Sequence, residues 1–260
     1  MTENSLVQLS CQGPIATVTL NDPSRLNVLS RAMINSLKTR LEDASQTPGV
    51  HVIMLRAYGR AFCAGHDLGE LAMGEGGDSS EATKALFEHC VQLMTMLPTL
   101  PQPVIAAVQG VATAAGCQLV ASCDLAVASE DAKFGLNGID VGLFCYTPMV
   151  AASRAMMPRK CFEMLVSGNF LSAVEACAAG LINRTVAADQ LETETLSLAN
   201  TIAAKDPEAI ALGKAAFYKQ LQEPLKQAYA TGREAILRNL TLPETQRQIA
   251  GFGQKRKTTS

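Results

Sequence analysis

Several common signatures of function are missing from this 260-residue chain. It contains no P-loop, no Gly-x-Gly-x-x-Gly after a strand and no Gly-x-Ser-x-Gly, which argues against nucleotide hydrolases, dinucleotide oxidoreductases and serine hydrolases. No apolar run approaches the roughly 18 residues that a bilayer-crossing helix needs, so no membrane partner is expected. The chain has 22 Lys and Arg against 24 Asp and Glu. Because the net charge is only −2, nucleic acid is not an expected partner either.

Metal and disulfide signatures are also missing. The 8 cysteines form no Cys-x-x-Cys pair, and with 3 scattered histidines they give no spacing typical of metal ligands. Cys117, Cys123 and Cys161 lie in apolar contexts, so we expect reduced thiols in the core and no metal. The first five residues show neither the pattern of a secretion signal nor that of a transit peptide, and a cytoplasmic location is the default expectation.

The pattern of apolar residues predicts alternating strands and helices. Strands are expected at 6–10, 15–20, 51–56, 104–108, 124–128 and 181–186, with helices after Ser30 and over 81–97, and a loop over 69–80. From Asp189 onward the pattern is helical, with breaks at Pro207, Pro224 and Pro243. Strands that alternate with helices and then give way to helices indicate an α/β core followed by a helical region.

Two junctions rich in small residues are the most informative parts of the chain. In the first, the buried strand at 104–108 is followed by Gly110 and the small residues 112–116, and the apolar series from Leu119 fits the start of a helix. Small side chains let a ligand approach the backbone, and the free N–H groups of a first helical turn favour negative charge. We therefore expect the reactive site at this junction.

The second junction follows the strand at 51–56. Gly65 permits backbone geometry that is denied to other residues, so the amide of His66 can be aimed inward. Donors from two separate turns that meet on one oxygen form an oxyanion hole, which stabilises charge developing on a carbonyl.

At this point the chain resembles the crotonase (enoyl-CoA hydratase/isomerase) superfamily. The matching segments are 60–68, 103–119, 123–128, 134–135, 141–143, 171–183 and 252–257. The resemblance extends from Ile15 to Lys257. It implies a crotonase-like spiral of ββα units over residues 1–200, which binds acyl-CoA, and a C-terminal helical region over 201–260 for oligomerisation and CoA contact. It also implies a homotrimer or a dimer of trimers.

The resemblance assigns specific roles to residues at the two junctions. The main-chain N–H groups of His66 and Ala115 would hold the thioester carbonyl of an acyl-CoA while an enolate-like intermediate forms. Coenzyme A would thus enter as part of a substrate or ligand, and no permanently bound cofactor is expected. The CoA path would include Arg25, Leu26, Asn27, Ala64, Asp67, Leu68, Phe252 and Lys255. For the last two residues, an ordinary solvated terminus is the alternative.

The chain departs from the family at the two glutamates of its hydratases. Their positions are occupied here by Gln118 and Gly138, and neither side chain can transfer a proton. Water addition by the usual route is therefore doubtful. Asp140 is a candidate replacement, and Cys145, Tyr146 and the His66 ring are others; each has a purely structural role as its alternative. Gln118 either orients a substrate or water through its amide, or simply packs.

Two classes of function remain open. The first is an enzyme related to enoyl-CoA hydratases and isomerases, acting on an acyl-CoA through an enolate with a relocated acid or base. The second is a non-catalytic acyl-CoA-binding protein. Both predict that CoA esters bind, and only the first predicts turnover.

Overall fold

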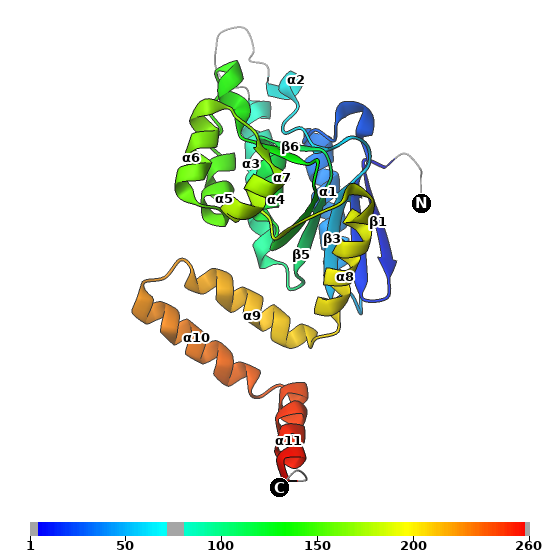
Figure 1. Ribbon diagram of the computed structural model, residues 1–260, viewed down its shortest axis with the longest axis vertical. Helices are drawn as coiled ribbons and strands as arrows, with labels where there is room; N and C mark the ends of the chain where they lie inside the picture. Colours follow the sequence, from blue (N-terminus) through cyan, green and yellow to red (C-terminus); the bar gives the residue numbers. More distant parts are fainter. Residues whose placement is uncertain (1–4, 72–80, 258–260) are drawn as a thin grey trace.

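The computed structural model describes the backbone of residues 5–71 and 81–257, with side chains in these ranges as far as residue 251. The chain forms two mostly parallel sheets covered by helices, followed by a helical arm (Figure 1). The α/β class predicted from the alternating pattern is confirmed. Within the described ranges, none of the helices combines the length and apolarity that crossing a bilayer requires.

The larger sheet has six strands in the order β1-β2-β3-β5-β7-β10. These are β1 (Val7–Gln12), β2 (Ile15–Leu20), β3 (Val52–Ala57), β5 (Val104–Val108), β7 (Leu125–Ser129) and β10 (Arg184–Val186). The first two strands pair antiparallel, and the others pair in parallel. All five residues of β5 are buried, as expected for a parallel strand that is covered on both faces.

The smaller sheet positions the two junctions that are rich in small residues. Its order is β4-β6-β8-β9, formed by β4 (Ala61–Cys63), β6 (Val111–Thr113), β8 (Lys133–Gly135) and β9 (Leu171–Ser172). Strands β4 and β6 are parallel neighbours, with Cys63 paired to Ala112. Because both strands run in the same direction, the turns that follow them emerge at the same edge of the sheet.

Helices cover the sheets and connect their strands. The longer ones are α1 (Arg31–Gln46), α3 (Glu81–Met96), α4 (Ala115–Ser122), α5 (Pro148–Ala155), α6 (Pro158–Ser167), α7 (Ala173–Ala179) and α8 (Leu191–Ala203). Short turns of helix are α2 (Leu68–Leu71), η1 (Pro23–Arg25), η2 (Leu97–Thr99), η3 (Asn137–Val141) and η4 (Ala188–Gln190). Ser30 begins α1 as predicted, because its hydroxyl accepts a hydrogen bond of 3.2 Å from Met33 N.

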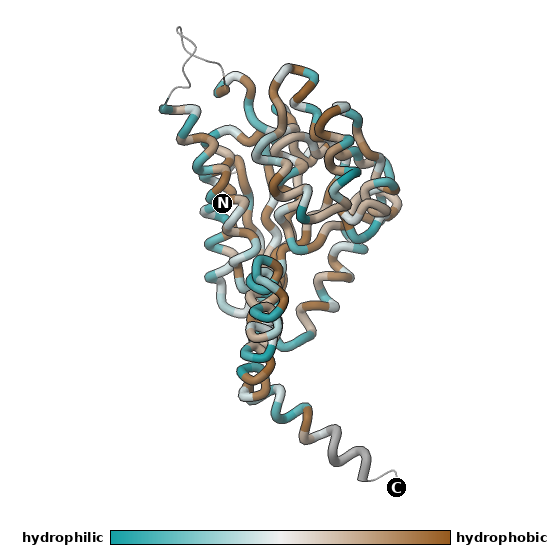
Figure 2. The backbone as a smooth tube through the Cα atoms, turned by 90° about the vertical axis from the view of Figure 1, so that its left-hand side faces the viewer, coloured by the Kyte–Doolittle hydropathy of each residue, from teal (hydrophilic) through white to brown (hydrophobic). Residues whose placement is uncertain are grey.

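The C-terminal helices α9 (Pro207–Gln220), α10 (Leu225–Asn239) and α11 (Pro243–Lys257) extend away from the sheets (Figure 1). Apolar residues are interspersed with polar ones along α9, α10 and the coloured part of α11 (Figure 2). Each predicted break lies at a helix start: Pro207 and Pro243 are first residues, and Pro224 precedes α10. Proline is tolerated there because first-turn N–H groups lack helical partners. The predicted boundary at residue 200 stays a prediction.

Three local predictions differ most from the structure, and several other predicted bounds are shifted by one or two residues. Helix α4 begins at Ala115 and not near Leu119, because the small residues before Leu119 already have helical geometry but carry no apolar pattern. The strand expected over 181–186 is limited to Arg184–Val186. Of the loop expected over 69–80, the first residues belong to α2, and residues 72–80 lie outside the described part of the chain.

Candidate active site

The turns after β4 and β6 both depend on unusual backbone geometry. Gly65 has φ +89°, in the region that favours glycine. Ala114, which immediately precedes α4, has φ +49° and ψ −118°. A non-glycine residue in such a conformation costs on the order of 1–3 kcal/mol, and such strain tends to occur at functional sites. The strained residue Ala114 thus lies immediately before the first residue of α4.

The two turns touch each other. A Cβ placed on Gly65 would lie 3.0 Å from Thr113 O and 3.4 Å from Ala115 N. A Cβ placed on Gly116, in the first turn of α4, would lie only 2.1 Å from Cys63 O. Glycine at both positions therefore lets the start of α4 approach the end of β4 at backbone contact distance.

Free main-chain donors lie on these touching turns. Among the described residues, none accepts a hydrogen bond from the N–H of His66 or from that of Ala115. Ala115 is fully buried and is the first residue of α4, so its N–H belongs to the positive end of the helix dipole. Two unpaired donors on adjacent turns can bind and polarise one carbonyl oxygen.

Gln118 lies one helical turn after Ala115 on α4. Its side chain is 4% exposed, and its Oε1 is buried without a hydrogen-bond partner among the described residues. Side chains on a helix lean toward its N-terminus, so this carboxamide inclines toward the end of α4 that carries the free donors. A carboxamide can orient a ligand but cannot exchange a proton with it.

Gly138 leaves no room for a side chain. A Cβ at this position would lie 2.1 Å from Leu143 O and 3.0 Å from Cys145 Sγ. Leu143 N also donates a hydrogen bond of 2.9 Å to Gly138 O, which closes the loop over that space. Position 138, which the resemblance aligns with the second hydratase glutamate, therefore has no space for a side chain.

Asp140 lies on the exposed side of η3. In a 3₁₀ turn, residues two apart do not share a face, so the side chain of Asp140 does not point where a side chain at position 138 would point. Asn137 Nδ2 donates to Asp140 Oδ2 over 3.5 Å, and a Cβ on Gly168 would meet Asp140 Oδ1 at 2.3 Å. Asn137 also accepts a hydrogen bond from Thr113, at the end of β6. The proposed proton-transfer role of Asp140 stays a prediction.

The imidazole of His66 packs beside the turn that carries its own amide. Its Nδ1 lies 3.2 Å from Leu29 O, and its ring meets that of Phe87 on α3 edge to face at 5.2 Å. Its Nε2 is buried with no hydrogen-bond partner in the described chain. Burial lowers the pKa of His66 below its usual 6.5, although the Leu29 carbonyl and Glu70 act in the opposite direction.

The structure brings most of the predicted CoA-path residues together. Ala64 N donates a hydrogen bond of 3.0 Å to Leu26 O, which joins the 25–27 turn to the turn after β4. Arg25 forms an ion pair with Asp67, and the neighbouring Leu68 is 64% exposed.

Asn27, in contrast, stabilises the backbone of this turn with its side chain. Its side chain is fully buried, donates to Tyr58 O and Ala61 O at 2.9 Å each, and accepts from Asp22 N at 2.8 Å. These bonds use both amide hydrogens and the oxygen, so Asn27 shapes the turn. The side chains of Phe252 and Lys255 lie outside the described residues.

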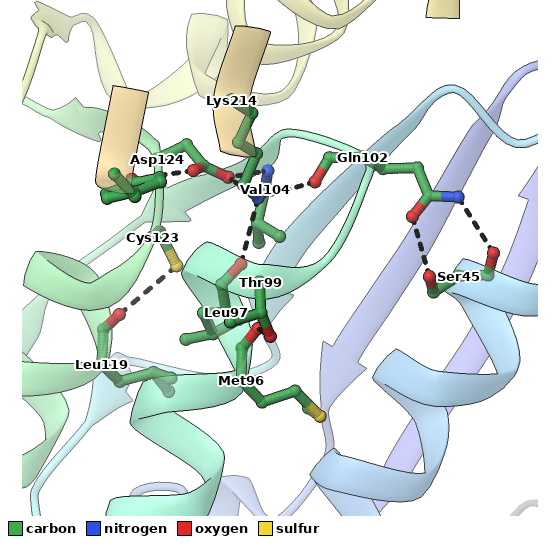
Figure 3. Close-up of polar contacts among 11 residues, drawn as sticks. Ser45, Met96, Leu97, Thr99, Gln102, Val104, Leu119, Cys123, Asp124 and Lys214 are labelled. Carbon is green, nitrogen blue, oxygen red and sulfur yellow. Dashed lines mark hydrogen bonds and ion pairs between the residues drawn. The ribbon is translucent and has the colours of Figure 1, made fainter. Parts of the chain in front are cut away.

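One polar cluster was not foreseen from the sequence. Lys214 Nζ on α9 donates to Asp124 Oδ2 at 2.6 Å, to Gln102 O at 2.9 Å and to Leu97 O at 3.0 Å (Figure 3). Tyr218 OH donates to Asp124 Oδ1 at 2.8 Å. The spacing of Lys214 and Tyr218, four residues apart on a helix, was an available signal, but it does not identify a partner 90 residues away.

No group of three or more potential metal ligands occurs among the residues that the structure describes. Burial raises the pKa of the Cys63 thiol to about 12, and it also raises the pKa of Cys145. All eight cysteines are free thiols. Burial also raises the pKa of Cys117, Cys123 and Cys161, so these core thiols stay neutral.

Comparisons with known proteins agree with this geometry. The family model for enoyl-CoA hydratase/isomerase matches residues 10–259. A mouse protein named enoyl-CoA hydratase domain-containing protein 3, mitochondrial, is 42% identical over 98% of this chain and 84% of its own length. The crystal structure of human enoyl-CoA hydratase domain-containing protein 3 gives a TM-score of 0.92 at 40% identity, covering 96% of this chain and 98% of that one.

A crystal structure of an enoyl-CoA hydratase from Mycobacterium smegmatis gives a TM-score of 0.91 at 43% identity, covering 96% of each chain. The relatives from mouse, zebrafish and human that are named domain-containing protein 3 all carry the word mitochondrial in their names. The predicted cytoplasmic location is therefore wrong. This prediction was based on the absence of a targeting pattern in the first five residues, and the absence of a pattern does not identify a compartment.

The resemblance inferred from the two junctions is confirmed over nearly the whole length of the chain. The touching turns after β4 and β6, the fold that positions them and these similarities together lead to one conclusion. This chain belongs to the enoyl-CoA hydratase/isomerase family.

Proposed function

We propose that this protein is an enzyme that binds an acyl-CoA and stabilises the enolate form of its thioester. The main-chain N–H groups of His66 and Ala115 hold the thioester oxygen. Losing a single oxyanion donor typically raises a reaction barrier by about 3–4 kcal/mol. The coenzyme A portion passes the turn at 25–27 and the segment 64–68, where Arg25 and Asp67 form their ion pair.

One observation carries this proposal: the close approach of the two turns. The Cβ position of Gly65 lies 3.4 Å from Ala115 N, and the donors at positions 66 and 115 have no partners in the described chain. A buried N–H without a partner is costly, on the order of 1–3 kcal/mol. A ligand carbonyl would satisfy both donors at once.

A non-catalytic acyl-CoA-binding protein is the second candidate, and a specific observation favours it. Gln118 cannot transfer protons. At position 138 a Cβ would lie 2.1 Å from Leu143 O, so no side chain fits there unless this backbone oxygen moves. A panel of enoyl-, 3-enoyl-, hydroxyacyl- and malonyl-type CoA esters, followed by mass spectrometry, separates the two candidates. Binding without any change of mass in every ester would favour the second.

Substitutions at Ala115 test the oxyanion hole. Ala115→Pro removes the N–H, and we expect it to reduce turnover at least 100-fold, since one such donor contributes about 10²–10³ to the rate. Ala115→Gly keeps the N–H and is the matched control. Circular dichroism and thermal unfolding check that both variants fold. Full activity in a folded Ala115→Pro protein would contradict the proposal.

The proposed assembly is a homotrimer or a dimer of trimers, formed through the C-terminal helices. Large apolar side chains on α9 and α10 support this proposal, because Phe217, Leu225 and Tyr229 are 55%, 75% and 74% exposed. Exposed apolar surface of this kind marks interaction sites.

A further inference from the structure

We propose that Asn137 is a positioning residue, which keeps the main-chain N–H of Ala115 directed at the thioester oxygen by binding the hydroxyl of Thr113. This inference rests on the proposed function, since it requires the Ala115 N–H to bind that oxygen. Asn137 acts on the ester only through the turn that carries Ala115.

The backbone of this turn needs support from its surroundings. Ala114 has φ +49° and ψ −118°, and a non-glycine residue keeps such a conformation only where neighbouring groups restrain it on several sides. Main-chain bonds supply part of that restraint: Ala114 N donates to Gly135 O at 2.9 Å, and Gln118 N donates to Ala114 O at 3.0 Å. The residue before Ala114 is restrained through its side chain as well.

That residue is Thr113, the last of β6, and its hydroxyl lies between two acceptors. Thr113 Oγ1 is 3.4 Å from Gly135 O and forms a shorter hydrogen bond with Asn137 Oδ1. A hydroxyl has one hydrogen to donate, so the shorter bond takes it. Because Asn137 is the first residue of η3, this bond attaches the strained turn to the loop that begins there.

The carboxylate of Asp140 determines which atom of the Asn137 amide faces Thr113. A carboxylate only accepts, so the amide nitrogen Nδ2 faces Asp140 Oδ2 at 3.5 Å, and Oδ1 is turned toward the hydroxyl. Asp140 in turn packs against Gly168, immediately after α6, where an added Cβ would lie 2.3 Å from Asp140 Oδ1. A continuous series of contacts therefore joins the end of α6 to the turn before α4.

Breaking the bond between Thr113 and Asn137 removes the side-chain restraint next to the strained residue. Ala114 can then relax toward an ordinary conformation, and this change of backbone angles turns the Ala115 N–H away from the oxygen. The His66 N–H lies on the other turn and keeps its place. Because two donors polarise the carbonyl together, misdirecting one of them weakens the polarisation and leaves the ester bound.

Infrared spectroscopy of a bound ester measures this polarisation. The probe is butyryl-CoA, the thioester of a saturated four-carbon acid, isotopically labelled at its carbonyl carbon, and its C=O stretching frequency falls when donors bind the oxygen. Spectra are recorded with the protein in excess, so that all of the ester is bound. Thr113→Val removes the hydroxyl at nearly constant shape, Thr113→Ser keeps it, and Asn137→Ala removes the acceptor. Thr201→Val on α8 is the control, since the Thr201 hydroxyl bonds to Ser197 O.

We expect the wild-type protein, Thr113→Ser and Thr201→Val to lower the frequency by the same amount. Thr113→Val and Asn137→Ala should each lose about half of this shift or more, because one of two donors is misdirected. The double variant should lose no more than either single variant, since both changes break the same hydrogen bond. Thermal unfolding checks that every variant folds.

The inference is overturned if a folded Asn137→Ala protein keeps the wild-type shift, if Thr113→Ser loses as much of it as Thr113→Val, or if the double variant loses clearly more than either single one. A wild-type protein that binds butyryl-CoA with no fall in frequency, or that does not bind it, would instead overturn the proposed function itself.

Discussion

At the scale of single residues, Gly138 shows how the structure changes the meaning of a sequence difference. The resemblance aligns Gly138 with a hydratase glutamate, and a mutation could in principle restore an acid there. The 2.1 Å separation between a Cβ at this position and Leu143 O rules out a simple restoration. A glutamate at this position would therefore require the loop over 138–143 to move.

Substituting Gly138 by alanine should destabilise the protein. Forcing an extra carbon into this space costs about 1–3 kcal/mol of unfolding free energy, because Leu143 O belongs to the backbone and must move. Thermal or urea unfolding measures the change. Gly232→Ala on α10 is the control: a Cβ there meets nothing within 4 Å, and alanine in a helix gains up to about 1 kcal/mol over glycine. Equal stability of wild type and Gly138→Ala would contradict the packing described here.

Gly65 is the second residue whose backbone geometry shapes the proposed site. Gly65→Ala places a Cβ 3.0 Å from Ala114 Cβ and from Thr113 O, at a φ of +89° that alanine rarely adopts. We expect the two turns to separate and acyl-CoA binding to weaken about tenfold or more, as polar contacts to the thioester lose their alignment. Isothermal titration calorimetry with butyryl-CoA measures this change. Gly213→Ala on α9, where a Cβ meets nothing within 4 Å, should bind as wild type does.

At the scale of elements, the cluster around Lys214 attaches the C-terminal arm to the core. Lys214 Nζ has three oxygen partners, and the carboxylate of Asp124 also accepts a hydrogen bond of 2.6 Å from Val104 N (Figure 3). Burial lowers the pKa of Lys214, while Asp124 favours its charged form and limits that shift. The ion pair joins α9 to Asp124, immediately before β7, and the hydrogen bond to Leu97 O joins α9 to the first residue of η2.

Removing the lysine charge should loosen this attachment. Lys214→Met leaves the largely buried carboxylate of Asp124 without its cation, and breaking a buried pair in this way typically costs about 3–5 kcal/mol. We expect a lower free energy of unfolding and faster amide hydrogen exchange in α9. Lys219→Met alters an exposed lysine on the same helix and should change stability by less than about 0.5 kcal/mol. Wild-type stability and exchange in Lys214→Met would show that the cluster does not hold the arm.

The elements also show what could be read from the sequence. Apolar periodicity predicted β2 and β5 at their observed bounds, since side chains in a buried strand must be apolar. It misplaced the start of α4 because Ala115 and Gly116 carry no apolar pattern. It could not reveal the Lys214 cluster or the closed space at Gly138, which both depend on residues that meet only after folding. The main-chain donors at His66 and Ala115 were predicted from the resemblance of the two junctions to family motifs, and apolar periodicity gave no indication of them.

At the scale of the whole molecule, the arm exposes more large apolar side chains than an isolated chain would favour. Leu221, Ile236 and Leu237 are 61%, 54% and 59% exposed, in addition to those named above. We expect light scattering to give three or six times the 27.5 kDa of one chain. Leu225→Lys with Tyr229→Lys should lower this mass, because two charges would be buried in the contact. A monomer for the wild-type protein would contradict the proposed assembly.

The central claim is that two main-chain N–H groups hold one thioester oxygen, and a crystal structure with bound butyryl-CoA tests it most directly. We predict that the thioester oxygen lies about 2.7–3.1 Å from both His66 N and Ala115 N. An oxygen that contacts neither nitrogen, or N–H groups that point away from each other in the complex, would contradict the account.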